Sequence, residues 1–177
     1  MTRIEELAQL KAFARQDGFF LSLLWIASFA FIVAAPSSMM GNLLAFATPF
    51  FVGWRLCKFR DNALDGVISM RRGMAYCFYT FVYASLVFAL AQFIYFRFLD
   101  HGNFFAMLSE SMNNIGPVYE QYGISQQELK QTMDMMGSMS PIQWAFTFMM
   151  QNFIVGFFLS IPIAAICARR ANIIRNS

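Results

Sequence analysis

The sequence predicts an all-α integral membrane protein: a four-helix bundle of transmembrane helices with a helical extracytoplasmic loop between helices three and four. Hydrophobic residues make up 58% of the 177 residues and charged residues only 13%, against roughly 25% charged residues in soluble domains. Four long uncharged runs lie between Asp17 and Arg169. We therefore expect a single membrane domain over residues 1–177.

The basic residues give the orientation of the chain. When alternate flanks of the runs are assigned to opposite sides of a bilayer, 11 of the 13 basic residues fall on one side. This is the positive-inside bias, and it places both termini in the cytoplasm. The other side receives only Arg97 and Lys130. The eleven cytoplasmic residues are Arg3, Lys11, Arg15, Arg55, Lys58, Arg60, Arg71, Arg72, Arg169, Arg170 and Arg175.

The chain begins with a charged segment, residues 1–17, in which apolar residues recur at weakly helical spacing. We expect a cytoplasmic amphipathic helix on the inner membrane surface. The first transmembrane helix covers residues 18–35, close to the roughly 20 residues that cross a hydrocarbon core. A signal peptide is an alternative, but Pro36 would follow the cleaved bond, and signal peptidase tolerates proline badly there. We therefore expect an uncleaved helix that ends at Pro36.

The second transmembrane helix covers residues 39–57. Arg55 interrupts its uncharged run, and we expect its guanidinium to snorkel to the inner surface. Pro49 lies in mid-span, where it removes a backbone donor and crowds the carbonyl of Ala45, so the sequence predicts a kink. A turn-rich inner loop, residues 58–72, follows the helix.

The third transmembrane helix covers residues 73–96 and the fourth residues 142–168. Ser140 followed by Pro141 is a typical helix start, with an N-cap and proline at the first helical position. The fourth helix is longer than a bilayer is thick and contains Pro162, so we expect tilt or a bend.

The extracytoplasmic loop covers residues 97–140. Its first half has helical spacing that is interrupted at Gly116 and Pro117. Its second half opens with Ser125 and Glu128 in the spacing of a capping box, and an apolar face follows. We expect two short helices, packed on the outer membrane surface or over the mouth of the bundle.

Polar and small residues within the spans suggest two candidate sites. Gln92, Gln151 and Asn152 are candidates for a polar pocket, although interhelical hydrogen bonding explains them more simply. No ionisable residue lies within the four predicted cores, which argues against a proton relay. Small residues recur every four positions on the fourth helix and predict a packing seam against another helix of this chain or of a second copy. The seam residues are Asn152, Gly156, Ser160, Ala164 and Ala168.

No pattern predicts a catalytic residue, a cofactor or a resident metal. Thioethers suit Cu(I), but His101 is the only further candidate ligand near the loop methionines. The methionines also fit an amphipathic helix that meets lipid. The cysteines have no CxxC spacing, and we interpret them as free thiols that act as small apolar residues. The loop methionines are Met133, Met135, Met136 and Met139, and the cysteines are Cys57, Cys77 and Cys167.

Five short segments along the chain form a recognisable order. They are Asp65-Gly-Val-Ile-Ser-Met-Arg-Arg-Gly73, Tyr95-Phe-Arg-Phe-Leu-Asp100, Gly123-Ile-Ser-Gln-Gln-Glu-Leu129, Ser140-Pro141 and Ala168-Arg-Arg170. In this order they resemble a domain-of-unknown-function family of small bacterial inner-membrane proteins, number four thousand one hundred and ninety-nine. His101 departs from the family pattern, because we expect proline after Asp100. The resemblance implies the four-span topology and a bacterial inner-membrane location, and it provides no catalytic residue.

From these observations we expect a non-enzymatic accessory or scaffold that acts by helix and loop contacts. Its expected partners are anionic lipid headgroups at the cytoplasmic face, and a membrane-protein partner or a homo-oligomer; we expect no nucleic acid. The alternative is a small oligomeric transporter or channel for a neutral or amphipathic solute. An enzyme ranks third, because it requires an inner-surface pocket around a lipid phosphate that gathers Arg55, Asp61, Asp65, Arg71 and Arg72.

Overall fold

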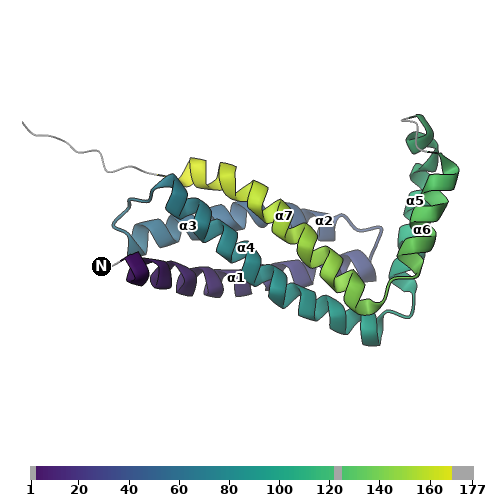
Figure 1. Cartoon of the computed structure of the whole chain (residues 1–177), viewed down its shortest axis with the longest axis horizontal. Coiled ribbons are helices and arrows are strands. Elements are labelled where there is room, and N and C mark those ends of the chain that lie inside the picture. Colours follow the sequence, from purple (N-terminus) through teal and green to yellow (C-terminus); the bar gives the residue numbers. More distant parts are fainter. Residues whose placement is uncertain (1–2, 122–124, 169–177) are drawn as a thin grey trace, which may run out of the picture. The chain divides into compact units, whose positions relative to one another are not determined.

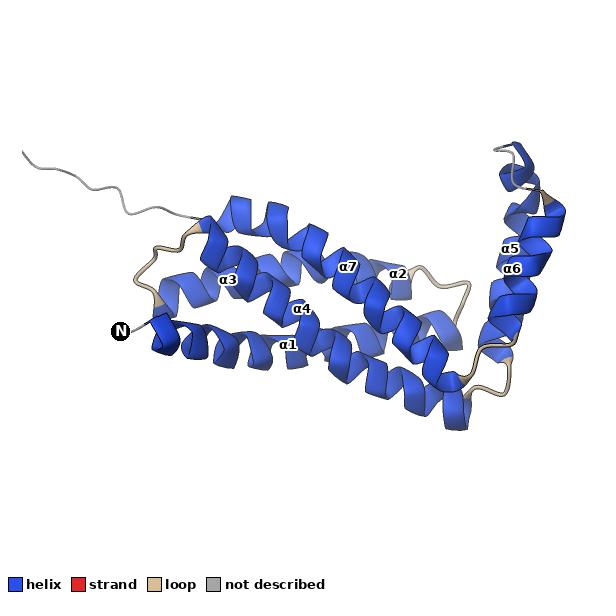
Figure 2. Ribbon diagram, in the orientation of Figure 1, coloured by secondary structure: helices blue, strands red, loops and turns tan. Residues whose placement is uncertain are grey.

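The computed structural model describes residues 3–121 and 125–168, and Figure 2 shows them as helices joined by loops, with no sheet. The prediction of an all-α fold is therefore confirmed. Three helical stretches are long and apolar enough to cross a membrane, namely Ile4–Ala34, Met70–Leu99 and Pro141–Cys167. The chain divides into two compact units, residues 1–89 with 148–177, and residues 90–147.

Helix α1 (Arg3–Ala34) opens the first unit and runs without a break through Asp17. The expected division at residue 17, with a separate helix on the membrane surface, is not what the structure has. Leu10, Ala14, Asp17 and Leu21 are all buried. Their spacing places them on one face of a single helix, so this face continues from the charged segment into the apolar one.

The second predicted span is divided between α2 (Met40–Phe46) and α3 (Thr48–Ala63). Pro49 lies in the first turn of α3, where its missing N–H costs nothing, so the break falls beside the predicted kink. Helix α1 contacts both pieces. The Trp25 indole donates to the Thr48 hydroxyl at 2.9 Å, and the Ser28 hydroxyl donates to the Gly41 carbonyl at 2.7 Å. Helix α3 also extends into the predicted inner loop, which the structure reduces to residues 64–69.

Helices α4 (Met70–Ile94) and α7 (Pro141–Cys167) correspond to the third and fourth predicted spans. The start of α7 is confirmed, since the backbone N–H of Ser140 donates to Gln143 Oε1 at 2.7 Å. Helix α7 continues through Pro162. In Figure 1, α1, α3 and the first-unit parts of α4 and α7 lie lengthwise beside one another.

The small-residue stripe of α7 packs on α4 of the same chain. A Cβ added to Gly156 would lie 2.6 Å from Phe81 Cβ, so only glycine permits this approach. A Cβ on Gly73 would lie 3.3 Å from Ala164 Cβ. Ser160 is buried, and Asn152 and Ala168 at the ends of the stripe are half-buried.

The second unit contains the π-helical turn η1 (Tyr95–Leu99) and the helices α5 (Asn103–Gln121) and α6 (Gln126–Gly137). The rings of Phe96, Phe104 and Trp144 pack on one another, with centroids 5.3 to 5.9 Å apart. They join η1, the start of α5 and the start of α7, so the second unit has its own aromatic core.

The two predicted loop helices are confirmed, but α5 does not stop at Gly116 and continues to Gln121. The capping box of α6 is present: Ser125 N–H donates to Glu128 Oε2 at 2.9 Å, and Glu128 N–H donates to Ser125 Oγ at 3.2 Å. The hydrogen bonds that the Ser125 N–H and hydroxyl donate to Glu128 Oε2 lower the pKa of the Glu128 carboxyl. Two close contacts hold α5 against α6: a Cβ on Gly137 would lie 2.9 Å from the Phe105 ring, and one on Gly116 would lie 3.6 Å from Leu129.

The glycine contact between α7 and α4 gives a first prediction. Replacing Gly156 by alanine should destabilise the protein by about 1 to 3 kcal/mol, because the new methyl group overlaps the Phe81 side chain. Gly53→Ala is the matched control, because the nearest atom to its Cβ would be 3.8 Å away and alanine favours the helix. Thermal unfolding in mild detergent should show a lower Tm for the first variant only. Equal Tm values for the two variants would contradict the seam.

Candidate functional site

A buried polar cluster joins three helices of the first unit. Asp17 of α1 forms an ion pair with Arg55 of α3, whose Nε donates to Asp17 Oδ1 at 2.5 Å. The hydroxyl of Tyr76 on α4 donates to the other carboxylate oxygen. The side chain of Asp17 is 2% exposed and that of Arg55 19%. Both oxygens of the enclosed carboxylate therefore have partners, as a buried charge requires.

The sequence did not predict this cluster. It placed Asp17 at the end of the charged segment, whereas α1 runs through Asp17 without a break. It predicted that Arg55 snorkels to the inner surface and gave no partner for the guanidinium, which the structure pairs with Asp17. The available signal was the helical spacing of Asp17 with Leu10 and Ala14, which places the carboxylate on the buried face of α1.

Aromatic rings surround the cluster. The Phe59 ring stacks on Tyr76 with centroids 4.8 Å apart and an interplanar angle of 9°, and Phe13 packs on Phe59 at 5.0 Å. The Arg55 guanidinium carbon lies 5.7 Å from the centroid of Phe20. These rings keep water away from the carboxylate, which strengthens its pairing with the guanidinium and the phenol.

A second polar contact lies at the C-terminal end of α7. Arg60 is 5% exposed, and its Nη1 donates to the Cys167 carbonyl at 2.8 Å. Its Nε and Nη2 bind the two carboxylate oxygens of Asp61 at 2.7 and 2.9 Å. The hydrogen bonds that Arg60 donates to the Asp61 carboxylate raise the pKa of the Arg60 guanidinium, against the lowering effect of burial. The contact of Arg60 with α7 could not be read from the sequence.

Three of the charged residues that the sequence suggested for an enzymatic pocket each have a partner of opposite charge. Arg55 faces Asp17, Asp61 faces Arg60, and the guanidinium of Arg72 lies 3.6 Å from Glu6 of α1. The Asp17–Arg55 pair joins α1 to α3, the Glu6–Arg72 pair joins α1 to α4, and the Arg60–Asp61 pair lies within α3. Among the residues that the structure describes, no group of three or more His, Cys, Asp or Glu side chains could hold a metal ion.

The thiols lie beside the polar contacts. Cys57 of α3 and Cys167 of α7 have their Sγ atoms 3.3 Å apart, and Cys167 Sγ lies 3.5 Å from the carbonyl of Gly53. Cys77 of α4 is fully buried, and all three thiols are free. The sequence gave no sign that two of the cysteines meet.

The predicted polar pocket of Gln92, Gln151 and Asn152 stays a prediction. Gln92 is 2% exposed, and its Oε1 has no hydrogen-bond partner among the described residues. Gln151 is exposed and Asn152 is half-buried. In α6, Met133 and Met136 are half-buried with Leu129, as the predicted apolar face requires, while Met135 is 65% exposed.

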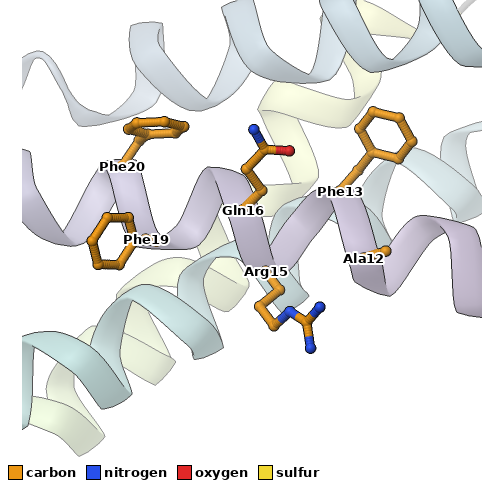
Figure 3. A pocket seen from close by; sticks show the side chains of 6 residues that line it. All are labelled: Ala12, Phe13, Arg15, Gln16, Phe19 and Phe20. Atoms are coloured by element: carbon orange, nitrogen blue, oxygen red, sulfur yellow. The ribbon is translucent and has the colours of Figure 1, made fainter.

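An open groove lies along one face of α1, with a volume of about 510 Å³. The groove is lined by Ala12, Phe13, Arg15, Gln16, Phe19 and Phe20, and Figure 3 shows that all six side chains come from α1, with Arg15 and Phe19 below the helix in this view and Phe13, Gln16 and Phe20 above it. Arg15 and Gln16 are exposed. The groove therefore offers a cation, an amide and apolar rings on successive turns of one helix.

The all-α fold with three long apolar helices is that of a multi-pass membrane protein. The chain belongs to the family described as Protein of unknown function (DUF4199), which it matches over residues 8–169. This confirms the family resemblance seen in the sequence. No curated protein and no solved structure matches the chain. The family description assigns no activity, so the function must be argued from the geometry.

The buried ion pair gives a second prediction. Asp17→Asn should destabilise the protein by about 3 kcal/mol, because it leaves the enclosed Arg55 guanidinium without a counter-charge. Glu6→Gln is the matched control, because it removes the same charge from a pair whose carboxylate side chain is 44% exposed, and it should cost less than about 1 kcal/mol. Denaturant unfolding in mild detergent measures both. Equal losses would show that the Asp17 pair does not hold the bundle together.

Proposed function

We propose that the chain is a four-span protein of the bacterial inner membrane with both termini in the cytoplasm. Helices α1, α4 with η1, and α7 supply three spans, and α2 with the first turns of α3 supplies the fourth. Leu43, Phe46 and Phe50 support the fourth span, because they are 59%, 71% and 68% exposed and need an apolar solvent. On this topology Asp17, Arg55 and Tyr76 lie at the cytoplasmic boundary of the bilayer.

We infer that the protein acts by contact, as a non-enzymatic accessory or scaffold of another membrane component. The supporting observation is that the buried charged side chains bind other parts of the same chain. Asp17 and Arg60, the buried charged residues of the described chain, are both engaged in contacts between helices or with a neighbouring side chain. The outer face of α7 supplies a large apolar surface for such contacts, with Ile154 at 56%, Phe158 at 63% and Ile166 at 84% exposure.

The groove on α1 supports binding of anionic lipid at the cytoplasmic face. On the proposed topology, Arg15 lies at headgroup depth, and Phe19 and Phe20 lie one turn further into the apolar layer. A phospholipid has the same order of groups, with a phosphate above its acyl chains. A basic residue near an anionic surface contributes about 1 kcal/mol of attraction.

The topology gives a third prediction. An epitope tag inserted at Ser125, in the exposed first turn of α6, should be accessible to antibody on spheroplasts, because residues 97–140 are proposed to be extracytoplasmic. The same tag after Ser177 should be accessible only after the membrane is permeabilised. Accessibility of the Ser125 tag only from the cell interior would overturn the four-span arrangement.

The contact function gives a fourth prediction. When the chain is extracted with its surrounding membrane in polymer nanodiscs, a second membrane protein and anionic phospholipid should be retained with it. Arg15→Ala should reduce the retained anionic lipid about fivefold, the effect of losing roughly 1 kcal/mol of attraction. Proteomic and lipid mass spectrometry of the same preparation measure both.

Lys130→Ala is the matched control for this experiment, because it removes one exposed cation from the loop proposed to face outward. It should leave the retained lipid unchanged. Repeated recovery of the chain with no second protein would count against the accessory role. Equal lipid loss in the two variants would count against the groove on α1.

A further inference from the structure

Two cysteines from distant parts of the sequence meet between α3 and α7. The Sγ atoms of Cys57 and Cys167 lie 3.3 Å apart although 110 residues separate them. Both thiols are free. A disulfide requires the sulfurs to approach by roughly a further 1.3 Å, to a bond length near 2.05 Å. A movement of this size lies within the reach of small side-chain rotations on two helices that are already in contact.

The surroundings hold the pair together. Arg60 lies three residues after Cys57 on α3, and its guanidinium donates to the Cys167 carbonyl at 2.8 Å. The Cys167 thiol also donates to the carbonyl of Gly53, one turn before Cys57 on α3. The two residues of α3 that contact Cys167 therefore lie on either side of Cys57 in the sequence, and both contacts hold Cys167 beside α3.

The two thiols differ in their access to solvent. Cys57 is half-buried, whereas Cys167 is 5% exposed. A small water-soluble oxidant therefore reaches Cys57 first, and Cys167 is the second thiol that completes the reaction. Cys77 is 0% exposed and has no such access.

We propose that Cys57 and Cys167 form an oxidant-sensitive dithiol that closes to an intramolecular disulfide when it meets a peroxide. The Cys57 thiolate attacks one peroxide oxygen, the O–O bond breaks, and a sulfenic acid and hydroxide form. The Cys167 sulfur then attacks the sulfenic sulfur, an S–S bond forms, the S–O bond breaks, and water leaves. In total, two thiols and one peroxide give one disulfide and two waters.

The product would join α3 covalently to the C-terminal end of α7, where Arg60 now joins them by a hydrogen bond. The disulfide would then be present only in chains that have met an oxidant at the proposed cytoplasmic boundary. This inference depends on the contact between the helices and stands whether the protein is a scaffold or a transporter.

The fifth prediction tests the dithiol. The full chain in mild detergent is treated with hydrogen peroxide, and free thiols are blocked before intact-mass measurement. The wild-type chain should lose about 2 Da, retain one blockable thiol and regain the mass with a dithiol reductant. Peptide mapping should identify the Cys57–Cys167 link directly, without any variant. Cys57→Ser and Cys167→Ser should each abolish the loss, and Cys77→Ser should leave it intact.

Three results would overturn the proposal. These are sulfinic acid on Cys57 without a cross-link, a disulfide that includes Cys77, and a cross-link between two chains. Because the peptide map is made on the wild-type protein, a variant that fails to fold does not affect the outcome. The mass measurement and the peptide map do not involve lipid or a partner. A failure of the dithiol proposal is therefore distinguishable from a failure of the proposed function.

Discussion

The carboxylate of Asp17 is the constraint on which the first unit depends. A charge enclosed among helices is costly unless its oxygens are fully paired, and here α3 and α4 each provide a donor, Arg55 and Tyr76. Sliding any of the three helices by one turn would leave a charge or a phenol without its partner. We infer that the cluster sets the register of α1, α3 and α4, a role for which apolar contacts alone are poorly suited.

Close contacts of small residues complete the bundle. Gly18 permits α1 to approach α4, Gly41 permits α2 to approach α1, and Gly156 permits α7 to approach α4, since a Cβ at each would come within 2.8 Å of a neighbouring atom. Where lipid surrounds a protein, helices gain little from the hydrophobic effect and associate through packing and hydrogen bonds. The polar cluster and the glycine contacts therefore have complementary roles, one setting register and the other setting distance.

The C-terminal half of α3, the first turns of α4 and the C-terminal end of α7 hold the residues with the most distinctive chemistry. Cys57 follows Arg55 by two residues on α3, and Cys77 follows Tyr76 directly on α4. The turns of helix that bury the ion pair thus also bring thiols into the bundle, and Arg60 ties the C-terminal end of α7 to α3.

Much of this architecture was predictable from the sequence, because hydropathy, capping and charge bias are properties of short segments. The chain itself determined the all-α class, the helix start at Pro141, the capping box of Ser125 and Glu128, and the break beside Pro49. It also determined the family, through motifs spread along its length. Helix boundaries were predicted less well where helical spacing continued past a charged residue or a glycine. Helix α1 continues through Asp17, and α5 continues through Gly116.

Only the tertiary structure decided which side chains meet. Asp17 finds Arg55 across 38 residues and Tyr76 across 59, and Cys57 finds Cys167 across 110. Such pairings depend on the rotation and register of each helix, and a difference of one residue in either moves a side chain to another face. The sequence therefore specified which segments are helical and which are apolar, while the packing of four helices against one another created the polar cluster and the dithiol.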